Sequence, residues 1–245
     1  MDDVVTIRLA PELWFFVAAP RRRAEFQVRY DGTASLGHVV QACNVPLTEV
    51  GALRVDGQPG RADQRLHPNA VVEVEPVARP QRVPGWRGGF ALDVHLGTLA
   101  RRLRLLGIDA TYRNDADDDE LVQLANAEGR ILLTQDRGLL KRRALRAGAF
   151  VRGARPADQL ADVLDRFAPP LRPWSRCPCC NGLIETVAKD DVTHLLQPGT
   201  RRTYHRFARC RECGKVYWQG AHGQRLQAIV ERASTLSGGD VGSTA

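Results

Sequence analysis

The sequence predicts an α/β protein in three parts, and three observations carry this prediction. Hydrophobic residues alternate with a period of two in residues 4–9 and 25–30, as in β-strands. Strand-like and helix-like segments then alternate from residue 89 to residue 168. Two Cys-x-x-Cys pairs follow. The predicted boundaries are a β-rich domain at 1–78, a linker at 79–88, an α/β domain at 89–168, a cysteine segment at 172–220, and a short helix with a disordered tail at 221–245.

The composition is that of a globular protein without a membrane span. Of the 245 residues, 43% are hydrophobic and 26% are charged, and no run approaches the roughly 20 apolar residues that cross a bilayer. The acidic start, Met1-Asp2-Asp3, differs from a signal peptide, which begins with a basic region and an apolar stretch. Paired cysteines in a reducing compartment favour metal binding over disulfides. We therefore expect a cytoplasmic protein with no membrane partner.

The first domain has the pattern of two paired strands, a helix and two further strands. Ser35 is a candidate N-cap for the helix, and Asp56-Gly57 marks a tight turn. Residues 71–75 form a closing strand. This order, with the segments "LRVDGQP" and "LHPNAVVEVEPV", resembles the β-grasp fold of ubiquitin-like sulfur carriers.

A working sulfur carrier needs a free Gly-Gly at its C-terminus. The candidate pair here, Gly88-Gly89, continues directly into Phe90. We therefore favour a binding or scaffolding module that meets a protein partner, and keep the carrier as an alternative. Recovery of an activating enzyme by the first domain would support the carrier.

The second domain reads as four strands, each followed by a helix, which predicts a parallel sheet. Leu96, Leu99, Leu103 and Leu106 recur at helical spacing until Gly107 ends the helix, and Gly129 ends the next one. The strands are expected at 89–93, 108–112, 130–134 and 149–152, and the later helices at 118–127, 138–147 and 157–167.

Acidic residues follow the first three strands of this sheet. Asp93 ends the first strand, Asp115 follows the second, and Asp136 follows the third. Asp118 and Glu120 open the second helix. Because the carboxyl ends of parallel strands meet at one edge, we expect these acids to converge there and to share Mg²⁺ or Mn²⁺. Such a metal site hydrolyses phosphodiesters. For Asp115 the alternative is a turn or N-cap role, and Asp117 and Asp119 suit a solvated helix start.

Basic residues complete this picture. The net charge is +7, and the stretch from 137 to 155 holds seven basic residues and no acidic one. A basic surface beside an acidic cluster suits a phosphate-containing substrate, although an arginine-rich composition alone also produces such runs. The candidate phosphate contacts are Arg101, Arg102, Lys141 and Arg142.

Three segments carry a family resemblance: "FALDVHLGTLARRLRLLGIDATYRNDADDDEL", "EGRILLTQDRGLL" and the cysteine-bearing tail. They resemble the PIN-like RNase family named for the C-terminal domain of the Mut-seven exonuclease, and the first domain is similar to the ubiquitin-like domain that accompanies it. The resemblance implies a PIN-like fold and RNA as substrate. It also implies catalytic roles for Asp93, Asp118, Glu120 and Asp136. PIN nucleases usually carry a further acid after the fourth strand, where this chain has Arg152 and Arg155 with Asp158 nearest.

The cysteine segment contains two knuckles, Cys177/Cys180 and Cys210/Cys213, separated by 29 residues. Four thiolates at this spacing predict a closed, structural Zn²⁺ site in a zinc ribbon. Cys179 could be the metal ligand in place of Cys180 only with a Cys-x-Cys spacing, which makes a poorer knuckle. Basic and aromatic residues between the knuckles suit an RNA-contacting ribbon, although a two-faced strand has the same alternation.

These observations favour a divalent-metal-dependent endoribonuclease of PIN-like type with an N-terminal ubiquitin-like domain. The alternative is a non-catalytic RNA-binding or adaptor protein that retains the fold.

Overall fold

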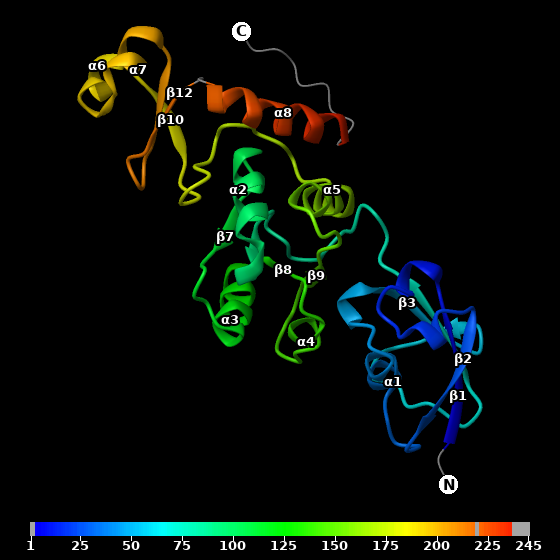
Figure 1. Cartoon of the computed structure of the whole chain (residues 1–245). Helices are drawn as coiled ribbons and strands as arrows, with labels where there is room; N and C mark the ends of the chain where they lie inside the picture. The colour runs from blue at the N-terminus through cyan, green and yellow to red at the C-terminus, as the bar shows by residue number, and fades with distance from the viewer. Residues whose placement is uncertain (1–2, 219–220, 237–245) are drawn as a thin grey trace. The chain divides into compact units, whose positions relative to one another are not determined.

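The computed structural model describes residues 3–218 and 221–236, and the chain divides into two compact units (Figure 1). Unit 1 contains Met1–Val83 and Leu133–Phe150, and unit 2 contains Pro84–Leu132 and Val151–Ala245. The first division falls within the predicted linker. The disordered tail that we predicted falls on residues 237–245, outside the described part. Across the described residues, no helix is both long and apolar enough to pass through a lipid bilayer.

Unit 1 is built on a five-stranded sheet of order β2-β1-β5-β3-β4. β1 pairs antiparallel with β2 and parallel with β5, so the strand predicted to close the domain lies in the middle of the sheet. Short helices η1 and η2 lie in the connection between β1 and β2. The predicted ββαββ order is found with one addition, because the two-residue strand β4 makes three strands after the helix. Its elements are β1 (Asp3–Leu9), η1 (Pro11–Leu13), η2 (Ala19–Arg21), β2 (Glu25–Tyr30), α1 (Leu36–Ala42), η3 (Leu47–Glu49), β3 (Val50–Val55), β4 (Gln58–Pro59) and β5 (Val71–Pro76).

Local sequence explains the start of α1 and the β3–β4 turn. The Ser35 hydroxyl accepts a hydrogen bond from the His38 backbone N–H at 3.3 Å, as an N-cap does. Asp56 and Gly57 both have positive φ, 51° and 77°, as a two-residue hairpin turn requires. The Asp56 carboxylate also accepts the Val71 N–H at 2.9 Å, which ties the turn to β5.

The second segment of unit 1, Leu133–Phe150, contains the helix α4 (Arg137–Leu140) and the strand β9 (Gly148–Phe150). Our prediction of a helix over 138–147 was wrong, because the helix ends after a single turn. Leu139 and Leu140 are buried, but the next five residues include only one large apolar side chain, Leu145. A longer helix would therefore lack a continuous apolar face.

Strands and helices alternate through the second domain as predicted. The sheet has the order β7-β6-β8-β9, and β6 runs parallel to β7. Gly107 and Gly129 adopt left-handed φ values, 78° and 62°, where α2 and α3 end. α2 contacts β7 and α5, and α3 contacts β6. The elements are β6 (Phe90–Leu92), η4 (Val94–Leu96), α2 (Gly97–Leu105), β7 (Ala110–Tyr112), α3 (Asp118–Glu128), β8 (Ile131–Thr134) and α5 (Pro156–Phe167).

The cysteine segment forms a three-stranded antiparallel sheet of order β10-β11-β12. Val192, Leu196 and Phe207 form its small core. Arg201 and Arg202, expected on the ribbon, lie instead on helix α7, because 29 residues between the knuckles leave room for helices. The elements are β10 (Ile184–Val187), α6 (Lys189–Val192), η5 (Thr193–Leu195), α7 (Pro198–Thr203), β11 (Phe207–Cys210), β12 (Val216–Trp218) and α8 (Ala221–Leu236), which packs on α2 and α5 (Figure 1).

Candidate functional site

The four knuckle cysteines come together in unit 2. The sulfur atoms of Cys177, Cys180, Cys210 and Cys213 all lie within 4.8 Å of one another. The Cys177–Cys213 and Cys180–Cys210 sulfur pairs are 3.7 and 3.4 Å apart. A tetrahedral zinc ion with Zn–S bonds of about 2.3 Å needs sulfurs about 3.8 Å apart. The donor set therefore fits a tetrahedral thiolate site.

The backbone around each knuckle makes this approach possible. Asn181 and Gly214, which follow the two pairs, have φ of 74° and 70°, and each turn closes with an N–H donated to a cysteine carbonyl. A Cβ on Gly182 would lie 3.0 Å from the Cys210 sulfur. The sulfur of Cys179 is not among the four, so the choice between Cys179 and Cys180 is settled by the fold.

A tyrosine that we did not single out from the sequence supports this site. The Tyr217 hydroxyl lies 2.9 Å from the Cys177 sulfur, within hydrogen-bonding distance. Burial alone raises the pKa of Cys177, but this hydrogen bond and those from nearby backbone N–H groups outweigh it and lower the pKa to about 7. The same contact, with burial, raises the pKa of Tyr217. These hydrogen bonds thus favour the thiolate form of Cys177, whereas burial raises the pKa of its partner Cys180.

The first knuckle is fixed to the α/β part of unit 2 through Arg104 of α2. This arginine is only 4% exposed. Its Nε donates to the carbonyl of Ala110 at 2.7 Å, and its Nη1 donates to the carbonyls of Cys179 and Pro178 at 2.8 and 3.3 Å. One guanidinium thus connects β7 with the cysteine turn. The sequence signal was a basic residue on the apolar face of α2, next to Leu103.

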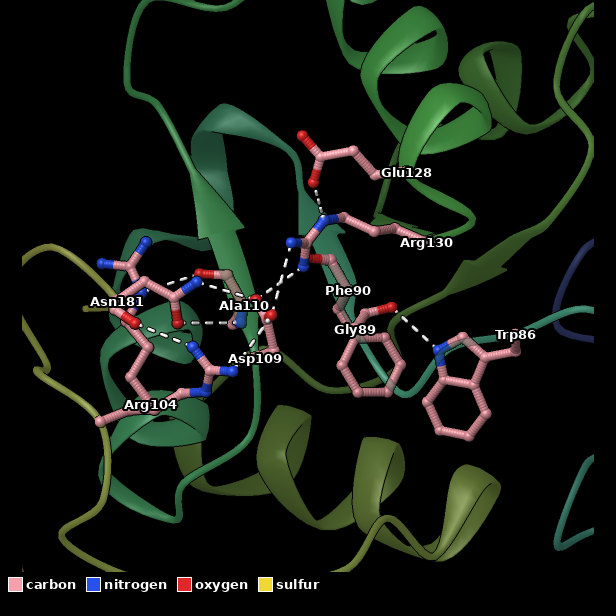
Figure 2. Close-up of polar contacts among 10 residues, drawn as sticks. Trp86, Gly89, Phe90, Arg104, Asp109, Ala110, Glu128, Arg130 and Asn181 are labelled. Atoms are coloured by element: carbon pink, nitrogen blue, oxygen red, sulfur yellow. Dashed lines mark hydrogen bonds and ion pairs between the residues drawn. The ribbon is translucent and has the colours of Figure 1, made fainter. Parts of the chain in front are cut away.

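Asp109 provides a second connection between the knuckle and β7 (Figure 2). Its carboxylate accepts from Arg130 at 2.6 Å and from the Asn181 amide at 2.8 Å, and it pairs with Arg176 at 3.3 Å. Asn181 in turn accepts the Ala110 N–H at 3.2 Å. Burial would raise the pKa of Asp109, but these hydrogen bonds and positive charges lower it. Asn181 thus both shapes the knuckle and attaches it to the sheet.

Asp93 lies where the sequence placed it, directly after β6. It is 6% exposed and occupies the N-cap position of η4, and its carbonyl accepts the Leu96 N–H at 2.9 Å. The Tyr112 hydroxyl of β7 donates to the Val94 carbonyl at 2.9 Å and steadies this turn. A Cβ on Gly97 would lie 2.7 Å from that hydroxyl, so the glycine of the "LGTL" segment makes room for the tyrosine.

The acids around the start of α3 are mostly exposed, and two of them interact with one arginine. Arg113 contacts Asp115 at 3.3 Å and Glu120 at 3.4 Å. Asp117, expected at a solvated helix start, is the N-cap of α3 and accepts the Glu120 N–H at 2.8 Å, so the N-cap role considered for Asp115 belongs to Asp117. Asp118 is the first residue of α3. Among the described residues of unit 2, these acids and Asp93 do not form a group as close as the cysteines.

Asp136 lies two residues beyond β8, in unit 1. Its carboxylate caps α4 by accepting the Gly138 N–H at 2.6 Å, and its own N–H donates to the Thr134 hydroxyl at 2.8 Å. The side chain is otherwise exposed. The tight loop between β8 and α4 thus fixes the carboxylate without burying it.

The candidate phosphate contacts divide into two pairs. Arg101 is exposed and Arg102 half-buried on α2. Lys141 and the half-buried Arg142 follow α4 in unit 1. The Lys141 ammonium donates to the Asn44 side chain at 2.6 Å, and burial lowers its pKa. Lys141 therefore has a structural partner that the sequence did not predict.

The family described as the Mut7-C RNAse domain matches residues 88–230, which is more than half of the chain. The family described as the Mut7-C ubiquitin domain matches residues 2–82. No curated protein and no solved structure matches the chain.

Proposed function

Because the chain belongs to the Mut7-C RNAse domain family, we propose that it is an endoribonuclease that hydrolyses RNA with Mg²⁺ or Mn²⁺. The observation that carries the proposal is the position of Asp93, a nearly buried carboxylate at the end of a buried strand. In a buried setting of low dielectric, the attraction between such a carboxylate and a bound cation is stronger than in water. The strand order supports the proposal further, since β6 neighbours both β7 and β8 and an aspartate follows each of the three strands.

In this proposal Asp93 and Asp136 hold the metal, and Asp118, Glu120 and Asp115 complete its surroundings. The cation, when bound, polarises the scissile phosphate and lowers the pKa of attacking water. The Arg113 ion pairs hold Asp115 and Glu120 at the start of α3 before a cation arrives. Arg101, Arg102 and Arg142 contact backbone phosphates, whereas Lys141 serves mainly to hold α4 in place.

We also propose that the four cysteines bind structural Zn²⁺. The sulfur geometry fits a tetrahedron, and four thiolates leave no ligand position for water. The zinc-bound knuckle is then connected to β7 through Arg104, Asp109 and Asn181, so that zinc binding also helps to fix this strand. The zinc therefore stabilises the fold and takes no part in the hydrolysis.

The test is cleavage of single-stranded RNA by the full chain, with Mg²⁺ or Mn²⁺. We expect Asp93→Asn and Asp136→Asn each to reduce kcat by roughly 100-fold or more. Asp190→Asn, an exposed acid of α6, is the matched control for the charge change and for contaminating nucleases. Activity equal to wild type in both site variants rejects the assignment.

A second candidate function is RNA binding without cleavage, and one observation favours it. The first acid after β9 in the sequence, Asp158, forms an ion pair with Arg155 at 2.9 Å. Asp162 accepts the Arg152 N–H at 2.8 Å. Both acids of this region are thus engaged, and the fourth carboxylate usual in PIN nucleases is not supplied by them. Salt-dependent RNA binding without metal-dependent cleavage would establish this alternative.

A protein partner of the ubiquitin-like domain, and a cytoplasmic location, stay predictions.

A further inference from the structure

The segment that carries Asp136 packs against the ubiquitin-like domain within unit 1. Leu140 and Phe150 are members of the same hydrophobic core as the strands and helix of that domain, and Leu145 packs at its border. The rings of Phe15 and Phe16 lie 5.2 and 5.4 Å from the ring of Phe150. The ubiquitin-like core is therefore built partly from residues that follow β8.

Arg137, the first residue of α4, makes the most specific of these contacts. Its Nη1 donates to the Phe16 carbonyl at 2.9 Å, and its Nη2 donates to the Phe15 carbonyl at 3.2 Å. The guanidinium carbon lies 5.2, 5.4 and 6.0 Å from the ring centres of Phe15, Phe16 and Phe150. A planar guanidinium satisfies two carbonyls and stacks on rings at once, which a lysine ammonium does not.

Three further hydrogen bonds support the two ends of the same segment. Lys141, just after α4, donates to the Asn44 side-chain oxygen at 2.6 Å, and the Asn44 amide donates to the Phe16 carbonyl at 3.1 Å. At the other end, the Phe150 N–H donates to the carboxylate of Glu49 at 2.8 Å. Glu49 is only 2% exposed. Buried charged acceptors make strong, geometrically defined contacts.

These contacts surround the loop that fixes Asp136. Asp136 directly precedes Arg137 and caps the same helix, so any movement of α4 moves the carboxylate. We propose that the ubiquitin-like domain is a positioning element of the nuclease, which holds Asp136 in place through Arg137 and Asn44. This inference rests on the proposed function. It assigns the domain a role within its own chain, in addition to any partner it binds.

The experiment uses the full chain with three variants. Arg137→Lys keeps the charge but loses the forked contact. Asn44→Gly removes the side chain that joins Lys141 to Phe16, and glycine tolerates the left-handed φ of 73° at this position. Arg29→Ala, an exposed arginine of β2, is the control for loss of a positive charge in the same unit.

We expect Arg137→Lys and Asn44→Gly to lower kcat about 10-fold or more and to raise the Mn²⁺ concentration for half-maximal activity, with the KM for RNA unchanged. Amide hydrogen exchange over residues 136–142 should accelerate in both, and Arg29→Ala should match wild type. Asn44 is neutral, so its substitution leaves the net charge of the chain unchanged.

Three outcomes overturn the inference. If the wild type cleaves RNA and both variants equal it in kcat and metal dependence, the domain does not position Asp136, and the proposed function stands. If only the KM for RNA rises, and only in Arg137→Lys, then Arg137 is an RNA contact. If the wild type cleaves no RNA with either metal, the proposed function fails and this inference fails with it.

Discussion

Arg104→Met tests whether the cysteine knuckle is held by the α/β part of unit 2. The substitution keeps an unbranched, flexible side chain in the buried position and removes the guanidinium that joins the carbonyls of Ala110, Pro178 and Cys179. Two of the three hydrogen bonds are short, at 2.7 and 2.8 Å, and the third is 3.3 Å long. The three carbonyls thereby lose a charged donor.

The expected change in the free energy of unfolding follows from two opposing contributions. Each hydrogen bond from a charged donor contributes about 1.5–3 kcal/mol, and the two short bonds of Arg104 dominate. Methionine removes the cost of burying a charge, a cost reflected in the pKa of Arg104, which burial lowers. We therefore expect a net loss of about 3 kcal/mol in the free energy of unfolding. For a domain of this size that corresponds to a fall of roughly 6–12 °C in Tm.

The assay is urea unfolding of the zinc-loaded protein, together with the rate at which zinc passes to a chelator. Arg104→Met should unfold at lower urea and release zinc faster, because the turn between Cys177 and Cys180 loses its support. Arg172→Met, an exposed arginine whose backbone is bonded to the end of α2, is the control. If both variants are equally stable and release zinc at the wild-type rate, the arginine does not support the knuckle.

Three further predictions concern unit 2. The pKa of Asp109 is lowered in the folded protein, so its stabilising effect is complete above its unfolded pKa of about 3.9 and is lost as the pH falls through the lower folded value. Below about pH 4 the free energy of unfolding should therefore fall more steeply with pH in wild type than in Asp109→Asn. Parallel plots of unfolding free energy against pH for the two proteins would contradict this. Gly97→Ala should cost about 1–3 kcal/mol by thermal melting because its Cβ displaces the tyrosine hydroxyl of β7, whereas Gly199→Ala, whose Cβ meets nothing within 4 Å, should be neutral or slightly stabilising. Cys177→Ser should lose bound zinc by elemental analysis, whereas Cys179→Ser should retain it; equal zinc contents would exclude the proposed ligand set.

The helix boundaries and the knuckles could be predicted because their causes are local. Ser35 caps α1 with its own side chain, and Gly129 ends α3 because it alone accepts a left-handed φ there without strain. The spacing of Cys177 and Cys180 places both sulfurs on one side of a single turn. Such features need only neighbours a few positions away.

The helix expected over 138–147 fails for the opposite reason. Its basic residues are good helix formers by propensity, but helices in proteins are stabilised mainly by packing. This segment packs against the ubiquitin-like core, in which Leu140 and Phe150 are buried. The residues between them do not form the continuous apolar face that a longer helix would need. Propensity could not predict a partner more than 100 residues away.

By itself, the sequence determined the alternation of strands and helices, the two Cys-x-x-Cys knuckles and the family to which the chain belongs, because periodicity, spacing and motifs are properties of neighbouring residues. Only the tertiary structure decided which distant groups meet: Asp109 with Asn181, Arg104 with the Cys179 carbonyl, and Arg137 with the Phe16 carbonyl. Each of these contacts satisfies a polar group that folding removes from water, and which group needs a partner depends on the whole fold.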